Sequence, residues 1–313
     1  SNALSLAADL FIDANDTVLL PDMNWDNYQL NFQDRAGAKL QFWKFFRDGR
    51  LDSTSFREAL AAPAPGSKLL CLLNFPNNPS GYTPTESEGQ DLADALLATA
   101  ARGVNVITLI DDAYYGLFFE ANIMRESLYS KLAGRHPRLL AVKADAATKE
   151  LYVWGLRIGF LTFSVGGAEN NSPLYAALEA KTAGLIRSTI SNCSLLSQKI
   201  ALRALLASGF YEQRAAKAAL MATRAQAVRQ ALDSHPEYAE YFVAYPFNSG
   251  YFMCLQIKKG DSELLRRLLL QKFGVGTISI TSTNLRIAFS CLEVNEIPDL
   301  FQLIYQAARE IEA

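Results

Sequence analysis

The stretch AVKADAATKELYVWGLRIGFL, residues 141–161, carries Lys149 and Arg157 at the junction of two β-type runs. The first run is apolar and ends in a loop of small residues that holds Lys149, and the second begins just after Arg157. A lysine that reacts through its amine needs a rigid, partly dry setting. An arginine close by could grip a phosphate as a bidentate clamp. Taken alone, both side chains have a plain alternative as solvated surface charges.

The chain around this stretch alternates apolar runs with helical segments. Residues 68–75 (KLLCLLNF) form a continuous apolar run, and residues 104–118 and 139–145 contain two more. Runs of this kind are typical of parallel strands covered on both faces. The alternation predicts an α/β fold around a mostly parallel sheet.

Polar side chains follow the predicted ends of these strands. Asn78, Asp111, Tyr114 and Lys149 each come just after one of the apolar runs. Ligands of parallel α/β sheets bind outside the carboxyl ends of the strands. The sequence therefore predicts that these side chains share one site.

Other elements are predicted from periodicity and from capping signals. After the PNNPSGY turn, Thr83 is the expected N-cap of a helix, with Pro84 at the first helical position and Glu86 completing a capping box. This helix should end near Arg102. The remaining predictions are helices at 4–11, 53–61, 123–133, 173–186, 195–207, 209–233, 261–273 and 296–312, strands or strand-like runs at 16–21, 28–32, 159–164, 249–257 and 284–290, and a loop at 166–173.

Composition narrows the class of protein. The 313 residues are 50% hydrophobic and 20% charged, with a net charge of −2, and no polybasic block indicates nucleic acid or an anionic membrane. No apolar stretch approaches the roughly 20 residues that cross a bilayer. Both histidines precede proline, which argues against a Ser-His-Asp hydrolase or a metal centre. We expect a large domain at 1–212 and a small α+β domain at 213–313.

Four cysteines are spread along the chain without a CxxC pair. This usage predicts reduced thiols in a cytoplasmic protein rather than disulfides or zinc ligands.

Five motifs in order carry a family resemblance: NPSG (78–81), DDAYY (111–115), TKE (148–150), GLRIG (155–159) and NLRIAFS (284–290). The chain resembles the class I/II aminotransferases, fold-type I pyridoxal-phosphate enzymes of the aspartate aminotransferase superfamily. The resemblance implies a three-layer sandwich as the large domain and pyridoxal 5'-phosphate as cofactor. It also implies a homodimer that moves an amino group between an L-amino acid and a 2-oxo acid.

The resemblance also implies roles for individual residues. Lys149 matches the lysine that forms the internal aldimine and shuttles the α-proton. Asp111 matches the carboxylate that pairs with the pyridine nitrogen, although Asp112 beside it is an alternative. The other matches are Asn78 and Tyr114 for the ring's phenolic oxygen, Arg157 for the phosphate, Trp25 for stacking on the ring, and Arg286 for the substrate α-carboxylate. Tyr114 and Trp25 have an alternative as core aromatics, and Arg286 as a surface charge on a strand.

Arg187 matches the position where dicarboxylate-specific members supply an arginine to the neighbouring subunit's substrate. As a hypothesis, it favours an acidic substrate such as aspartate or glutamate. The alternative is an arginine of the dimer interface.

The chain departs from the family pattern in two places. Ala146 replaces a serine that often binds the cofactor phosphate, and the glycine-rich phosphate loop expected before the helix at 4–11 is absent. Each donor bond to a charged group contributes roughly 1.5–3 kcal/mol. We therefore interpret the chain as N-terminally truncated and expect weak cofactor binding and little activity.

Two other functions fit the same motifs. One is a lyase, decarboxylase or cyclopropane-forming synthase that uses the same cofactor and fold. The other is a non-catalytic sensor domain of a transcriptional regulator.

Overall fold

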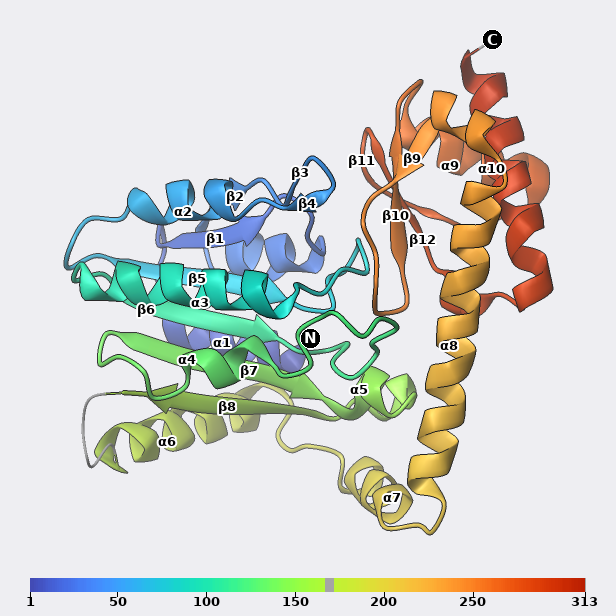
Figure 1. The fold of residues 1–313 in the computed structure, drawn as a ribbon. Coiled ribbons are helices and arrows are strands. Elements are labelled where there is room, and N and C mark those ends of the chain that lie inside the picture. Colours follow the sequence, from blue (N-terminus) through green and yellow to red (C-terminus); the bar gives the residue numbers. More distant parts are fainter. Residues whose placement is uncertain (167–171, 313) are drawn as a thin grey trace. The chain divides into compact units, whose positions relative to one another are not determined.

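The computed structural model describes residues 1–166 and 172–312, which fold as two compact units (Figure 1). The large unit comprises Ser1–Phe75, Pro84–Gly116 and Asn122–Phe210. The small unit comprises Pro76–Thr83, Leu117–Ala121 and Tyr211–Ala313. The loop predicted at 166–173 falls mostly outside the described residues.

A sheet whose described strands run in the order β2-β1-β5-β6-β7-β8 forms the centre of the large unit. The strands are β1 (Thr17–Pro21), β2 (Lys39–Trp43), β5 (Lys68–Asn74), β6 (Asn105–Asp111), β7 (Leu139–Ala146) and β8 (Gly159–Val165). All neighbouring strands pair in parallel except β8, which is antiparallel to β7. Residues 69–74 of β5 are all buried, as the continuous apolar run predicted. The predicted α/β fold with a mostly parallel sheet is confirmed.

Helices cover both faces of this sheet and complete three layers. On one face α3 (Glu86–Ala101) contacts β6, while α2 (Ser53–Ala61) and α4 (Leu128–Leu132) pack against α3 (Figure 1). On the other face α1 (Asn2–Phe11) contacts β7 and β8, and α6 (Ser172–Thr189) packs against α1. Shorter elements and α7 complete the unit: η1 (Gln29–Arg35), β3 (Phe46–Arg47), β4 (Arg50–Leu51), α5 (Ala147–Glu150), η2 (Trp154–Leu156) and α7 (Leu195–Leu205).

The strand-like run predicted at 28–32 is wrong, because η1 is a π-helix that begins at Gln29. Tyr28 and Phe32 are both buried, and their four-residue spacing places both on one face of the helical turn. The aromatic residues that suggested a strand therefore serve a helical turn, because tertiary packing overrides β-propensity.

The predicted start of α3 is displaced by one threonine. Thr85, not Thr83, is the N-cap, and it forms the capping box with Glu88 instead of Glu86. Thr83 is buried, and its N–H donates to Asn248 Oδ1 at 2.8 Å within the small unit. Both threonines precede a glutamate at the capping-box spacing, so the tertiary partner decides between them. The helix predicted at 123–133 is also shorter, since α4 covers Leu128–Leu132.

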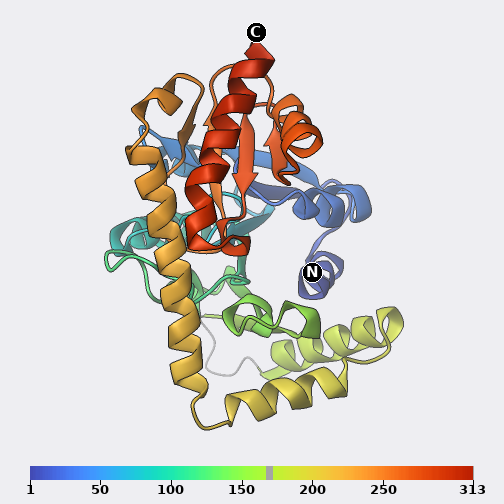
Figure 2. The same cartoon turned by 90° about the vertical axis from the view of Figure 1, so that its right-hand side faces the viewer.

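The small unit contains an antiparallel sheet whose described strands run in the order β11-β12-β10-β9. The strands are β9 (Phe242–Ala244), β10 (Met253–Ile257), β11 (Ile278–Thr281) and β12 (Asn284–Ile287). Its helices are α8 (Phe210–Asp233), α9 (Ser262–Phe273) and α10 (Ile297–Glu312), with short turns at η3 (Pro236–Glu240), η4 (Phe289–Cys291) and η5 (Val294–Glu296). Figure 2 shows α10 lying across the sheet, where Phe301 and Ile304 join the core around Leu255.

The NPSG turn belongs to this small unit. Gly81 has φ +74°, and a Cβ there would collide with the carbonyl oxygen of Phe252. Only glycine meets both conditions, since it tolerates positive φ and lets the two backbones approach. The turn is therefore fixed against the chain just before β10.

None of the described helices is both long enough and apolar enough to span a membrane.

Candidate functional site

Asp111 ends strand β6 and is only 5% exposed. The hydroxyl of Tyr28 donates to its Oδ2 at 2.7 Å, and the N–H of Ala113 donates to its Oδ1 at 3.1 Å. Burial raises the pKa of Asp111, while these two hydrogen bonds act in the opposite direction. The carboxylate is therefore buried, oriented through both oxygens and suited to a cationic partner.

Asp112, the neighbouring carboxylate, has different surroundings. Successive residues of a strand point to opposite faces of a sheet. The Lys143 amine lies 3.8 Å from Asp112 Oδ2 and 2.8 Å from Asp145 Oδ2. Burial raises the pKa of Asp112 to about 7, against a hydrogen bond from Ser127 and the charge of Lys143. Asp112 thus belongs to a separate charged cluster.

Lys149 lies in α5, one turn of helix directly after β7. Its amine lies 5.1 Å from the centre of the Tyr114 ring, and Tyr114 is only 8% exposed. A cation over a tyrosine ring is attracted by the electron-rich face. The structure thus brings two of the predicted residues, Lys149 and Tyr114, into contact.

The amino group of Ser1 marks where three predicted residues come together. Burial lowers its pKa, the charge of Asp111 raises it, and the charges of Arg157 and Lys149 lower it further. Such effects on one group require all three charges to be near it. Asp111, Lys149 and Arg157 therefore lie in one neighbourhood of the large unit.

Arg157 follows η2 with an exposed side chain, and its guanidinium Nη1 donates to the carbonyl of Trp154 at 3.1 Å. Its φ of 56° is left-handed, a conformation that non-glycine residues adopt rarely and that concentrates at functional sites. Arg157 is the predicted residue best placed to meet an anion from solvent.

Trp25 lies in the loop after β1 and is partly buried against the core of the large unit. Its ring meets the Tyr28 ring edge to face, with centroids 5.8 Å apart and an interplanar angle of 79°. Through Tyr28, the loop that carries Trp25 is connected to Asp111.

Asn78 and Arg286 meet within the small unit. Arg286 lies on β12 opposite Cys254 and is half-buried, and its Nη1 donates to Asn78 Oδ1 at 2.8 Å. Its guanidinium also lies 4.3 Å from the centre of the Phe252 ring. One amide and one aromatic face thus hold the guanidinium plane.

Arg187 lies exposed in the last turn of α6, and its Nη1 donates to Ser191 Oγ at 2.7 Å. Ser191 has a positive φ of 64°. This contact is local. Arg187 therefore lies on the surface of the large unit and not among the buried groups around Asp111.

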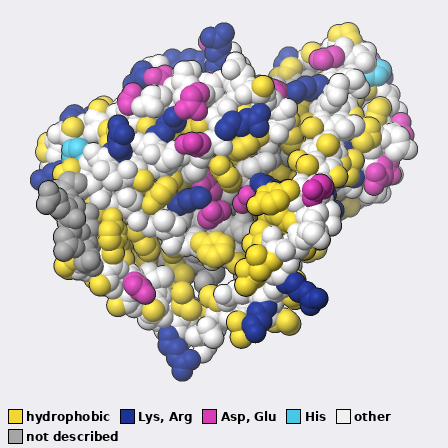
Figure 3. Space-filling model, turned by 60° about the horizontal axis from the view of Figure 1, so that its bottom comes forward, with side chains coloured by type: hydrophobic (Ala, Val, Ile, Leu, Met, Phe, Trp, Pro, Cys, Tyr) yellow, Lys and Arg dark blue, Asp and Glu magenta, His cyan; other side chains and the backbone are white. Residues whose placement is uncertain are grey.

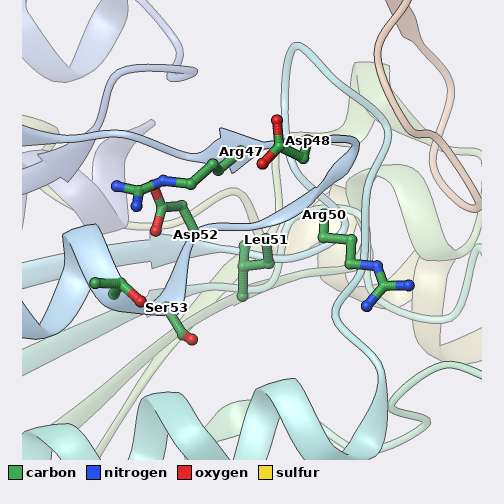
Figure 4. A pocket seen from close by; sticks show the side chains of 7 residues that line it. Arg47, Asp48, Arg50, Leu51, Asp52 and Ser53 are labelled. Carbon is green, nitrogen blue, oxygen red and sulfur yellow. The ribbon is translucent and has the colours of Figure 1, made fainter.

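A hollow opens at the β3–β4 hairpin and the start of α2. It is lined by Arg47, Asp48, Arg50, Leu51, Asp52, Ser53 and Thr54. Figure 4 shows Arg47 beside Asp52, its ion-pair partner at 2.7 Å, while Arg50 extends away from them. None of the predicted site residues lines this hollow.

Tyr28 is the site residue that the sequence reasoning missed. The signal was present, because a tyrosine buried in a core normally needs a partner for its hydroxyl. Its assignment to a strand-like run hid the turn in which the Tyr28 N–H donates to the Trp25 carbonyl at 2.9 Å.

The donor set of the large unit fits pyridoxal phosphate. A buried carboxylate suits a protonated ring nitrogen, an amine suits the aldehyde, and a solvent-facing guanidinium suits the phosphate. Asp111, Lys149 and Arg157 supply these groups from one neighbourhood. Two aromatic rings lie near these groups: Trp25 contacts Tyr28, and Tyr114 contacts Lys149.

The chain is similar to known aminotransferases in sequence. The family model "Aminotransferase class I and II" matches residues 1–304. The mitochondrial aspartate aminotransferase of Schizosaccharomyces pombe is 26% identical over 238 residues, covering 74% of this chain and 51% of that protein. The cytoplasmic aspartate aminotransferase of Saccharomyces cerevisiae is 25% identical over 224 residues, covering 70% and 51%. The chain thus spans about half the length of these curated relatives.

Solved structures share the fold. An aminotransferase from Anaerococcus prevotii has a TM-score of 0.83 at 20% identity, covering 99% of this chain and 73% of that one. An α-aminoadipate aminotransferase from Thermus thermophilus, complexed with N-(5'-phosphopyridoxyl)-L-leucine, has a TM-score of 0.77 at 21% identity, covering 99% and 75%.

Proposed function

We propose that this chain, which belongs to the class I and II aminotransferase family, carries the cofactor and substrate residues of a pyridoxal-phosphate-dependent aminotransferase. The reaction moves an amino group between an L-amino acid and a 2-oxo acid. The observation that carries the proposal is the buried, doubly hydrogen-bonded Asp111 in one neighbourhood with Lys149 and Arg157.

Pyridoxal phosphate, when bound, withdraws electrons from the α-carbon of the amino acid. Asp111 holds a proton at the ring nitrogen through its negative charge, which strengthens that withdrawal. Its burial makes the charge effective, because electrostatic attraction is stronger where water is excluded.

Lys149 supplies the amine that would take the proton from the α-carbon of the amino acid and hold it until it is returned. A lysine does this only when part of it is unprotonated at working pH. The contact with the Tyr114 ring orients the amine. Arg157 would bind the phosphate, and Trp25 would offer an aromatic face to the ring.

Arg286 binds the substrate α-carboxylate through its planar fork. The Asn78 amide and the Phe252 ring restrict the rotation of the guanidinium before substrate arrives, which lowers the entropic cost of binding. Asn78 is in turn the residue that we assign to the phenolic oxygen of the ring.

An acidic side chain is the substrate feature that Arg187 would recognise. The name aspartate aminotransferase, carried by both curated relatives above, supports a dicarboxylic amino acid. Arg187 is exposed, so we assign its substrate contact to the neighbouring subunit of a homodimer.

The homodimer is supported by exposed apolar side chains on α7 and just after it. Leu195, Leu196, Leu202 and Leu206 are 62%, 72%, 56% and 77% exposed. Figure 3 shows hydrophobic side chains with interspersed lysine and arginine on the face that includes this region. Large exposed apolar patches mark interaction sites. Sedimentation of the wild type as a dimer, and of Leu196→Asp as a monomer, would support this assignment.

We also propose a cytoplasmic location, which the cysteines support. The cysteines are all free, with Cys71 and Cys254 buried and Cys193 and Cys291 exposed, and all lie within the described residues. Free exposed thiols fit a reducing compartment such as the cytoplasm.

Absorbance spectroscopy with added pyridoxal phosphate tests the proposal. We expect a visible band in the wild type that is absent in Lys149→Ala. Transamination then predicts amino-group transfer that requires an added 2-oxo acid. Keto-acid release without an acceptor would instead indicate a lyase.

A further inference from the structure

The hydroxyl of Tyr28 lies in the interior of the large unit and points at the site. Tyr28 is 1% exposed, and its Oη lies 2.7 Å from Asp111 Oδ2. The two residues are far apart in the chain, so only the folded sheet and the η1 turn bring them together.

We propose that Tyr28 is a positioning residue for the cofactor reaction, whose hydroxyl fixes the orientation of the Asp111 carboxylate and keeps it ionised. The inference rests on the proposed function in one respect, that Asp111 serves the ring nitrogen of pyridoxal phosphate.

The direction of the hydrogen bond is fixed by chemistry. Burial and the charge of Asp111 both raise the pKa of Tyr28 well above its ordinary value. Tyr28 therefore stays protonated and always donates, while the carboxylate accepts. A donor that stays neutral stabilises the ionised acid without adding a second charge to the site.

The other groups around Asp111 do not replace this bond. Its pKa is raised by burial and lowered by Tyr28, by the Ala113 N–H, by the amino group of Ser1 and by Lys149. Asp112 is the neighbouring acid whose pKa Asp111 itself raises, and Tyr114 lies near Tyr28. Among these partners, Tyr28 alone is a buried side chain that donates directly to Oδ2.

A structural role alone would not need the hydroxyl. The Tyr28 ring packs in the core that includes Phe32 and Val18, and against Trp25, where a phenylalanine would fill the same space. Tyr28→Phe therefore removes the hydrogen bond and leaves the packing, which separates positioning from stability.

The first measurement is made on the cofactor-free protein. Carboxyl NMR of aspartate-labelled protein, with the Asp111 signal assigned by its loss in Asp111→Asn, gives the pKa of Asp111. Since a hydrogen bond to a charged group contributes the equivalent of about one to two pKa units, we expect Tyr28→Phe to raise this pKa by that amount.

Phe32→Leu is the matched control, because it disturbs the same core without touching the carboxylate. It should leave the pKa of Asp111 unchanged. An unchanged pKa in Tyr28→Phe, or an equal rise in both variants, would overturn the proposal.

The second measurement compares the binding of pyridoxal phosphate with that of its analogue in which carbon replaces the ring nitrogen. We expect Tyr28→Phe to weaken only the natural cofactor, by about tenfold or more, and most strongly at acidic pH, where the variant's Asp111 keeps its proton. Equal weakening of both molecules would show a merely structural role for Tyr28. Failure of the wild type to bind either would overturn the proposed function, while the NMR titration would still decide the role of Tyr28.

Discussion

Two charged side chains, Asp111 at the end of strand β6 and Arg286 on strand β12, are held in different ways. Asp111 is buried, and the Tyr28 side chain from a distant segment helps to hold it. Arg286 is half-buried, and the Asn78 amide and the Phe252 ring face hold its guanidinium. A buried charge costs free energy unless it is paired, whereas a half-buried guanidinium keeps part of its hydration. We infer that the first region is built for chemistry on one fixed ligand and the second for binding substrates that come and go.

Removing Lys149 should have the largest effect, because it eliminates the proton carrier of the chemical region. Lys149→Ala should lower amino-group transfer by roughly a hundredfold to ten-thousandfold, the range of general acid–base catalysis. Turnover with a 2-oxo acid acceptor measures it. Lys181→Ala, an exposed lysine on α6, is the control and should match the wild type. Retained activity in Lys149→Ala would end the distinction between the two regions.

Replacing Arg286 should affect binding more than chemistry. Arg286→Lys keeps the charge but loses the planar fork, so KM for the amino acid should rise about tenfold or more with a smaller change in kcat. Steady-state kinetics on Arg286→Lys, with exposed Arg309→Lys as control, separates these parameters. A fall in kcat at constant KM would assign Arg286 to the chemical region instead.

Asp112 gives a prediction about stability and pH. Its pKa is about 7 in the folded chain against 3.8 ordinarily. Between these two pH values the folded state keeps a proton on Asp112 that the unfolded state has lost. The contribution of the protonated Asp112 to the free energy of unfolding is therefore full below pH 3.8 and is lost as the pH rises to about 7. Asp112→Asn should remove this fall in the free energy of unfolding between pH 3.8 and 7, which amounts to a few kcal/mol.

Urea unfolding of Asp112→Asn and wild type at several pH values between 4 and 7 measures this difference. Asp34→Asn replaces an exposed acid and serves as the control, since it should leave the slope of unfolding free energy against pH as in the wild type. Parallel curves for Asp112→Asn and wild type would mean that Asp112 titrates normally.

Arg187 should give the smallest effect. It is exposed, and exposed ion pairs contribute only about 0.2–1 kcal/mol. Arg187→Ala should therefore reduce the preference for aspartate over alanine by only a few-fold, measured as a ratio of kcat/KM values. Arg203→Ala, also exposed, is the comparison. An unchanged ratio in Arg187→Ala would leave an interface role as the better interpretation.

The elements that depend on local sequence pattern could be predicted from the sequence. The apolar runs that became β5, β6 and β7 predicted a parallel sheet, and the positions of Asp111 and Lys149 after them made these two residues candidates for a site. Continuous burial leaves a direct trace in composition, which is why these elements were predictable.

Features that depend on distant partners were not predictable in this way. Tyr28 reads as part of a strand until its bond to Asp111 is known. Thr83 and Thr85 carry the same capping signal, but the Thr83 hydroxyl pairs with the distant Ser249 hydroxyl at 2.7 Å while Thr85 caps the helix. In both cases a side chain far away in sequence decides, and no local window contains it.

Lys149 is the amine that we propose to react with the cofactor. Incubation with pyridoxal phosphate, reduction with borohydride and mass spectrometry of the peptides test this directly. We expect a phosphopyridoxyl mass on the peptide that contains Lys149, and less of it when Asp111→Asn removes the partner of the ring nitrogen and weakens binding of the cofactor. A label spread evenly over the exposed lysines, with none enriched at Lys149, would contradict it.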